Sequence, residues 1–185
     1  MKKLIWAALS IFTLEILIII GCYWLFYGYA GNFSLTISRY VGLSSWSSLA
    51  FLVGNLAITT LSIIYMVNSD IKKFFWRFLV GVYAISLLAL SLCPHAPDGG
   101  QVTSIHRFFA AAMFISLCLL GLISADIVKG KLVRTYCIAF VLYGFHFIIA
   151  YVNHLPYLMG NILIWETAFV YGGFAILLLP NQQKS

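Results

Sequence analysis

Three ionisable side chains lie inside stretches that are otherwise apolar: Glu15, His146 and Glu166. On insertion scales an ionisable group at the centre of a bilayer costs about 3 kcal/mol, so each of the three is a candidate for function. At ~1.5 Å of helix per residue, His146 and Glu166 lie ~12 Å and ~8 Å from the ends that a short turn joins, whereas Glu15 is near the middle of its helix. We consider two roles for Glu15, a protonated carboxyl bonded to a neighbouring helix and a proton-relay group.

His146 belongs to a polar stripe. Tyr143, His146 and Asn153 are three and seven residues apart and therefore fall on one helical face. We expect this stripe to face the inside of a bundle, toward Glu166 and Asn55. Three roles fit such a group: a hydrogen-bonded pair that fixes helix packing, a polar cavity that contacts a ligand, and a reactive centre.

The most polar interruption of the chain is the segment 91–110, SLCPHAPDGGQVTSIHRFFA. Its charged and titratable residues are His95, Asp98, His106 and Arg107, and a later turn adds His154. Thr103 could cap a helix that begins beside His106. A helix N-terminus carries partial positive charge and Arg107 adds a full one, so this segment favours an anionic headgroup as ligand. The alternative is a loop solvated by water and lipid headgroups.

Histidines could also bind a metal or haem. A catalytic zinc takes three protein ligands and a water, and the candidates here are His106, His146 and His154. No HxxxH or HxxEH pair enforces that geometry, and only His146 lies clearly within a span. We therefore expect no cofactor, with zinc and haem as open alternatives. Cys22 and Cys93 would lie toward the same membrane face, where a disulfide between them is possible.

The composition indicates what holds these residues in place. The 185-residue chain is 63% hydrophobic and 9% charged, with a mean hydropathy of +1.00, whereas soluble domains have about 25% charged residues. A helix of about 20 apolar residues spans a bilayer. The pattern predicts an all-α polytopic transmembrane helix bundle that forms a single domain over residues 1–185. Six helices are expected, at residues 4–27, 47–67, 75–92, 108–128, 136–152 and 162–179.

The basic residues predict the orientation. Of the 11 Lys and Arg residues, only Arg39 and Arg107 fall on one side of the predicted helices. The positive-inside rule then places both termini in the cytoplasm and the loops 28–46, 93–107 and 153–161 outside. The net charge of +6 is a topology signal, and we expect no nucleic-acid partner. The first apolar run continues past Cys22 and contains Glu15, so we expect a transmembrane helix rather than a cleaved signal. The expected location is the plasma membrane, as a multi-pass protein of a bacterial inner membrane.

Two short motifs lie in the predicted outward loops. The first is Leu35-Thr36-Ile37-Ser38, and the second is Pro94 or Pro97 followed by His106 and the Ala-rich turn FFAAAMF. With the six-helix topology they resemble the DRAM/Sfk-type membrane proteins and their uncharacterised bacterial relatives. The resemblance implies cytoplasmic termini and a connection to membrane lipids, without a catalytic centre common to all members. Arg39 stands where relatives tend to carry an acidic residue, which puts shared acid chemistry in that loop in doubt.

These observations predict a small integral membrane protein with an outward-facing polar pocket that binds or handles a lipid headgroup or amphiphile. Its role would be binding, transport or regulation rather than catalysis. The residues expected to contact the ligand are His106, Arg107, His146, Glu166, Tyr143, Asn55, His95 and Asp98. One alternative is an intramembrane lipid hydrolase or transferase with a metal-bound water or a His/Glu pair as base. Another is an accessory subunit whose lipid-facing aromatics bind a membrane-protein partner or a second copy.

Overall fold

The computed structural model describes residues 2–27, 36–42, 44–69, 71, 74–93 and 101–178. Over these residues the regular structure is helical. The helices are α1 Lys2–Tyr27, α2 Ile37–Val41, α3 Ser45–Asn68, α4 Phe74–Leu92, α5 Gln101–Ile127, α6 Lys131–Val152, α7 Pro156–Met159 and α8 Ile162–Leu178.

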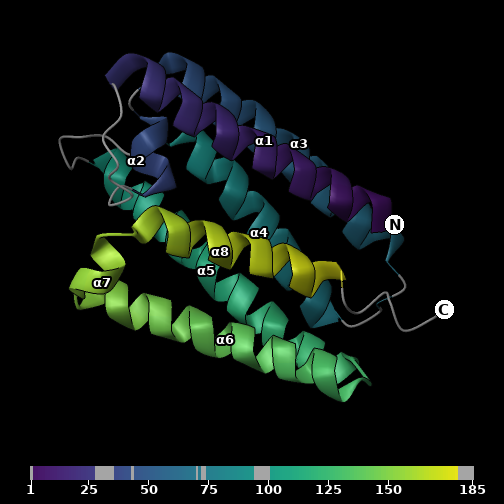
Figure 1. The fold of residues 1–185 in the computed structure, drawn as a ribbon. Helices are drawn as coiled ribbons and strands as arrows, with labels where there is room; N and C mark the ends of the chain where they lie inside the picture. Colours follow the sequence, from purple (N-terminus) through teal and green to yellow (C-terminus); the bar gives the residue numbers. More distant parts are fainter. Residues whose placement is uncertain are drawn as a thin grey trace.

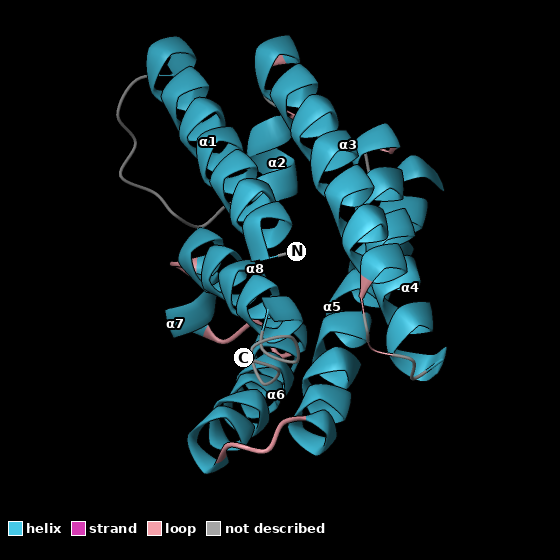
Figure 2. Cartoon of the chain, turned by 90° about the vertical axis from the view of Figure 1, so that its right-hand side faces the viewer, coloured by secondary structure: helices cyan, strands magenta, loops and turns pink. Residues whose placement is uncertain are grey.

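The long helices run up and down, and each packs against the next long helix in the chain: α1 on α3, α3 on α4, α4 on α5 and α5 on α6. The last helix, α8, closes the arrangement by packing against α1, α5 and α6 (Figure 2). Figure 1 shows the first residues of α1 and the last residues of α8 at one end of the bundle, and α2 and α7 at the other. We call these the basic end, after the cations at the starts of α1, α4 and α6, and the α2/α7 end.

Five helices are long and apolar enough to cross a membrane: α1, α3, α4, α5 and α6. The sixth predicted span is α8, which is apolar but shorter, at 17 residues. The apolar residues of α8 are distributed around the whole helix and not along one face. This pattern is typical of a helix buried among others. Phe169 of α8 is fully buried, with its ring centroid 4.7 Å from Phe114 of α5 and 4.9 Å from Phe140 of α6. The prediction of an all-α, multi-pass helical bundle is confirmed.

All three predicted outward loops contain helix. Residues 101–107 belong to α5, so that helix begins at Gln101 and not at residue 108, and α2 and α7 lie within the predicted loops 28–46 and 153–161. Hydropathy marks where a helix enters hydrocarbon, not where it ends. At ~1.5 Å per residue α5 is ~40 Å long, more than the ~30 Å of bilayer core.

The small residue Gly144 allows close packing in the core. A Cβ at this position of α6 would overlap Cys118 Sγ of α5 and the ring of Phe169 of α8. Small residues at such crossings let transmembrane helices approach closely. Gly144 therefore lets α6 approach both neighbours and brings the turn that follows α6 close to the start of α8.

Two arginines at the basic end bind carbonyls in the last turn of a helix or just beyond its end. Arg77 donates from Nε to the Ile71 carbonyl at 2.9 Å and from Nη2 to the Ser69 carbonyl at 3.0 Å. Arg134 donates from Nε to the Ala125 carbonyl at 2.9 Å, in the last turn of α5. The final carbonyls of a helix have no partner within it, and basic side chains satisfy them well.

Candidate functional site

Glu166 anchors the short helix α2. Its Oε2 accepts a 2.7 Å hydrogen bond from the backbone N–H of Ile37, the first residue of α2. A carboxylate suits this position because the first amides of a helix are unpaired and carry partial positive charge. The α2 residues Ile37, Tyr40 and Val41 are buried against the bundle. Glu166 thus connects α8 to an element from the first predicted outward loop.

His146 points out of the bundle. Its Nε2 is 2.9 Å from the Tyr157 hydroxyl of α7, and both side chains are exposed. The buried face of α6 is formed by Cys137, Phe140, Val141, Gly144, Phe147 and Ala150. The expectation that the stripe faces inward is therefore wrong for His146 and Asn153, because two phenylalanines and several small apolar residues occupy the inner face of this helix.

Aromatic rings surround the His146–Tyr157 pair. The His146 ring lies 5.9 Å from Tyr157, nearly parallel, and 5.9 Å from Trp165 of α8. Tyr143 stacks on Trp165 at 5.4 Å and donates from its hydroxyl to the Trp165 carbonyl at 2.9 Å. We call Tyr143, His146, Tyr157 and Trp165 the His146 cluster. It connects α6, α7 and α8 at the α2/α7 end.

His106 has a different position. It is 5% exposed, within α5, and its Nδ1 lies 2.7 Å from the Cys93 carbonyl. A carbonyl only accepts, so the ring donates from Nδ1 in this contact. The bond connects α5 to the residue that follows α4. Arg107, the next residue, is exposed.

The predicted capping role of Thr103 is not borne out. Thr103 is the third residue of α5 and is buried, so it lies inside the helix rather than at its N-cap. The α5 helix starts before the apolar run does, which is the reason for the error. His95 and Asp98 lie outside the described residues.

Asn55 faces α4 and not the His146 cluster. Its Nδ2 donates to Ser91 Oγ of α4 at 2.8 Å, while its Oδ1 has no hydrogen-bond partner within the described part of the chain. Glu15 packs on Gly54, the residue before Asn55 in α3. A Cβ on Gly54 would overlap Oε2 of Glu15. Neither Glu15 oxygen has a hydrogen-bond partner among the described residues. The predicted bond from Glu15 to a neighbouring helix is therefore absent there, because the nearest group on α3 is a glycine.

The described residues hold no group of three or more His, Cys, Asp or Glu side chains that could bind a metal ion. His106 is buried against Cys93 and His146 pairs with Tyr157, while His154 is exposed in the turn after α6. The three histidines therefore form no common ligand set. Cys22 and Cys93 are free thiols.

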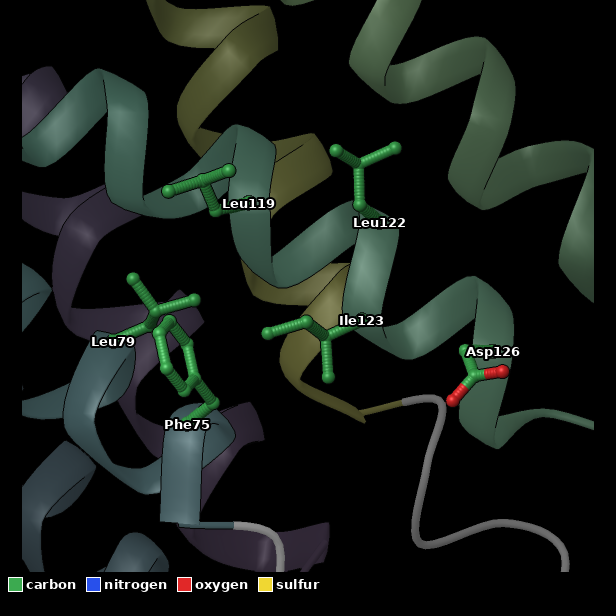
Figure 3. Close-up of a pocket in the computed structure, with 6 residues that line it drawn as sticks. All are labelled: Phe75, Leu79, Leu119, Leu122, Ile123 and Asp126. Carbon is green, nitrogen blue, oxygen red and sulfur yellow. The ribbon is translucent and has the colours of Figure 1, made fainter.

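An apolar groove of about 460 Å³ lies between α4 and α5. Its lining residues are Phe75, Leu79, Leu119, Leu122, Ile123 and Asp126. In Figure 3, Phe75 and Leu79 of α4 point toward Ile123 of α5, and the Asp126 carboxylate lies toward the basic end. The sequence does not predict this groove, because its residues look like any lipid-facing surface.

The fold defines a class, a multi-pass all-α membrane protein. No protein-family model matches the chain, and neither a curated protein nor a solved structure matches it.

Proposed function

We propose that this membrane protein binds the headgroup of a membrane lipid or a similar amphiphile at the α2/α7 end of its bundle. The observation that carries the proposal is the hydrogen bond of 2.9 Å between His146 and Tyr157 on the outer surface. The proposed contact surface is the His146 cluster. It replaces the pocket between helices that we expected from the sequence.

The depth of the cluster fits a headgroup. His146 is six residues before Val152, the last residue of α6, which at ~1.5 Å per residue puts it ~9 Å from the helix end. Trp and Tyr are enriched at this level of a membrane, since their rings are apolar and their N–H and O–H groups need polar partners. The cluster therefore offers a phosphate or hydroxyl group both polar contacts and an apolar rim.

Cations at the same end would favour an anionic headgroup. Arg39 on α2 and Arg107 near the start of α5 are exposed, and α2 and the start of α5 lie at the α2/α7 end (Figure 1). Arginine binds phosphate through two parallel N–H groups. In this proposal His106 and Glu166 hold the surrounding helices, and they do not contact the lipid.

The test is lipid retention by the purified, full-length protein. Native mass spectrometry with added phosphatidylglycerol would compare wild type with Tyr157→Phe, which keeps the ring and removes the hydroxyl. We expect retention to fall about fivefold, the factor for one lost hydrogen bond of about 1 kcal/mol. Tyr151→Phe is the matched control, because Tyr151 is exposed on α6 and its hydroxyl is outside the cluster. Equal retention in wild type and Tyr157→Phe would overturn the proposal, whereas equal losses in both Tyr variants would make the effect non-specific.

We further propose the predicted orientation, with both termini cytoplasmic in a bacterial inner membrane. The basic end supports it by the positive-inside rule, since Lys3, Arg77, Lys129, Lys131 and Arg134 gather there. The resemblance to DRAM/Sfk-type proteins stays a prediction of the same kind. A reporter fused at each terminus, active on one side of the membrane only, would test the orientation.

The second candidate function is that of an accessory subunit. The groove between α4 and α5, with Phe75 63% and Phe78 54% exposed beside it, favours a partner's transmembrane helix or a second copy. A stoichiometric partner that copurifies with wild type and is lost in Phe75→Ala would support it. The third hypothesis, a lipid hydrolase with a His146/Glu166 base, lacks its pair: each residue bonds elsewhere.

A further inference from the structure

Glu15 is the most enclosed carboxyl of the membrane spans. It is 2% exposed and follows Lys2, the first residue of α1, by 13 positions and precedes Tyr27, the last, by 12. At ~1.5 Å per residue it is ~18 to ~20 Å from either end of the helix. Water at either membrane surface is therefore distant from the carboxyl.

The carboxyl lies in a recess that α3 provides. A Cβ on Gly54 would overlap Oε2 and lie close to Cδ and Cγ of Glu15, so any larger residue would displace the group. Asn55 is 1% exposed and leaves its Oδ1 without a hydrogen-bond partner within the described chain. Tyr83 of α4, also 1% exposed, is near enough to interact electrostatically with Glu15. Residues of two helices, α3 and α4, thus lie around the Glu15 carboxyl of α1.

Within the part of the chain that the structure describes, no Lys or Arg bonds to the Glu15 carboxyl. The helices that pack on α1 are α2, α3 and α8, and of these only α2 carries a Lys or Arg, the exposed Arg39. The one cation of α4, Arg77, binds carbonyls at the basic end. An unpaired carboxylate is far more costly inside a membrane than the neutral acid, so burial of this kind selects the protonated form.

The other titratable groups that the neighbouring helices place near α1 are tyrosines and Glu166. From α8, the Tyr171 hydroxyl shares a 2.6 Å hydrogen bond with Thr13 Oγ1, and Glu166 accepts from Ile37. From α2, Tyr40 packs edge-on against Tyr23 of α1. From α4, Tyr83 interacts electrostatically with Glu15, and α3 adds Gly54 and Asn55, neither of which titrates.

We propose that Glu15 and its recess of Gly54 and Tyr83 form an intramembrane proton-binding site with one exchangeable proton. The ligand is a proton and not a metal ion, because hard cations take about six oxygen ligands. Among the described residues Glu15 has two oxygens without a partner, and Gly54 beside it has no side chain that could add another ligand. This inference is independent of headgroup binding at the α2/α7 end.

A hydrophobic carbodiimide tests the site in the folded, full-length protein. The acid adds across one C=N bond: its proton moves to nitrogen and its oxygen bonds to the central carbon. Migration of the acyl group from oxygen to nitrogen then gives a stable N-acylurea, with no leaving group. Only the protonated carboxyl reacts in this way, so the yield reports protonation. The adduct would be located by peptide mass spectrometry after labelling at mildly acidic and at alkaline pH.

We expect one adduct on Glu15, with a yield at least tenfold lower at alkaline pH, and its complete loss in Glu15→Gln. Glu166→Gln is the matched control and should leave the Glu15 adduct unchanged, since that residue lies on α8 and bonds to α2. The wild-type pH series decides the question even if a variant does not fold. The proposal fails if Glu15 is unlabelled at every pH, or if it is labelled to the same extent at acidic and alkaline pH.

Discussion

Glu166 on α8 accepts a 2.7 Å hydrogen bond from the backbone N–H of Ile37, 129 residues earlier in the chain. This single bond explains why a half-buried acidic residue occurs in an otherwise apolar helix. It also fixes α2 against the bundle, where α2 contacts α1, α3 and α8.

Removing this cap should loosen α2. In Glu166→Ala we expect a loss of about 0.5 to 2 kcal/mol, the range measured for helix N-caps, with faster hydrogen exchange at residues 37–41. Glu166→Gln keeps an acceptor oxygen and should lose less. Hydrogen exchange with mass spectrometry checks both, and unchanged exchange in Glu166→Ala would show that the bond does not hold α2 in place.

Gly54→Ala should destabilise the contact between α1 and α3. Its Cβ would overlap Glu15 Oε2, and overpacking of a core costs about 1 to 3 kcal/mol. Gly81→Ala is the matched control, since nothing lies within 4 Å of a Cβ there, and alanine at this position should be neutral or stabilising by up to about 1 kcal/mol. Thermal unfolding in detergent would measure both. Adding Glu15→Ala to Gly54→Ala should recover part of the loss, because the overlap is then removed.

Tyr40 should make the protein sensitive to alkali. Burial on α2, and secondarily the neighbouring Tyr23, raise the pKa of Tyr40 above its ordinary value of 10.0. The neutral phenol is therefore favoured in the folded protein: its stabilisation is complete below the unfolded pKa and is lost as the pH rises above it. We expect Tyr40→Phe to lose less stability than wild type between pH values below and above 10.0. Parallel losses in the two proteins, measured by thermal unfolding, would contradict this.

The substitution Arg77→Lys distinguishes two roles of Arg77, the positive charge that orients the protein in the membrane and the hydrogen bonds to the carbonyls that follow α3. The charge, and so the positive-inside signal, is kept. Lysine cannot reproduce the fork by which Arg77 reaches the Ile71 and Ser69 carbonyls together. We expect unchanged orientation in a fusion reporter and a loss of about 1 to 2 kcal/mol in unfolding experiments. A reversed orientation, or full stability, would show that one of these two roles is misassigned.

The long helices could be predicted from the sequence because each apolar run is as long as a bilayer is thick. The ends could not. Polar residues such as Thr103 and His106 continue α5 beyond the apolar run, and the five residues of α2 are too few to show a helical period.

The candidate site was predicted in part. His146 and Glu166 are at the same end of the bundle, as the short turn implied, but the sequence does not determine which way each side chain points. His146 turns outward because Phe147 and Gly144 occupy the inner face of α6. Tyr157, its partner, lies on the four-residue helix α7, and its contact depends on a tertiary turn that no spacing rule predicts. Glu15 could be identified from the sequence by its charge alone. The recess at Gly54 is visible only in the packing of α3 on α1.

The position of α8 has a consequence for biogenesis. The contacts of α8 with α1, α5 and α6 can form only after those helices have been synthesised, because α8 follows them in the chain. Until α8 is in place, Phe114 and Phe140 lack the ring contact that Phe169 provides. A chain stopped before Ile162 should therefore leave an exposed aromatic seam that quality-control proteases recognise. A separately expressed α8 segment could seal that seam in trans, as happens for membrane proteins that assemble from split halves.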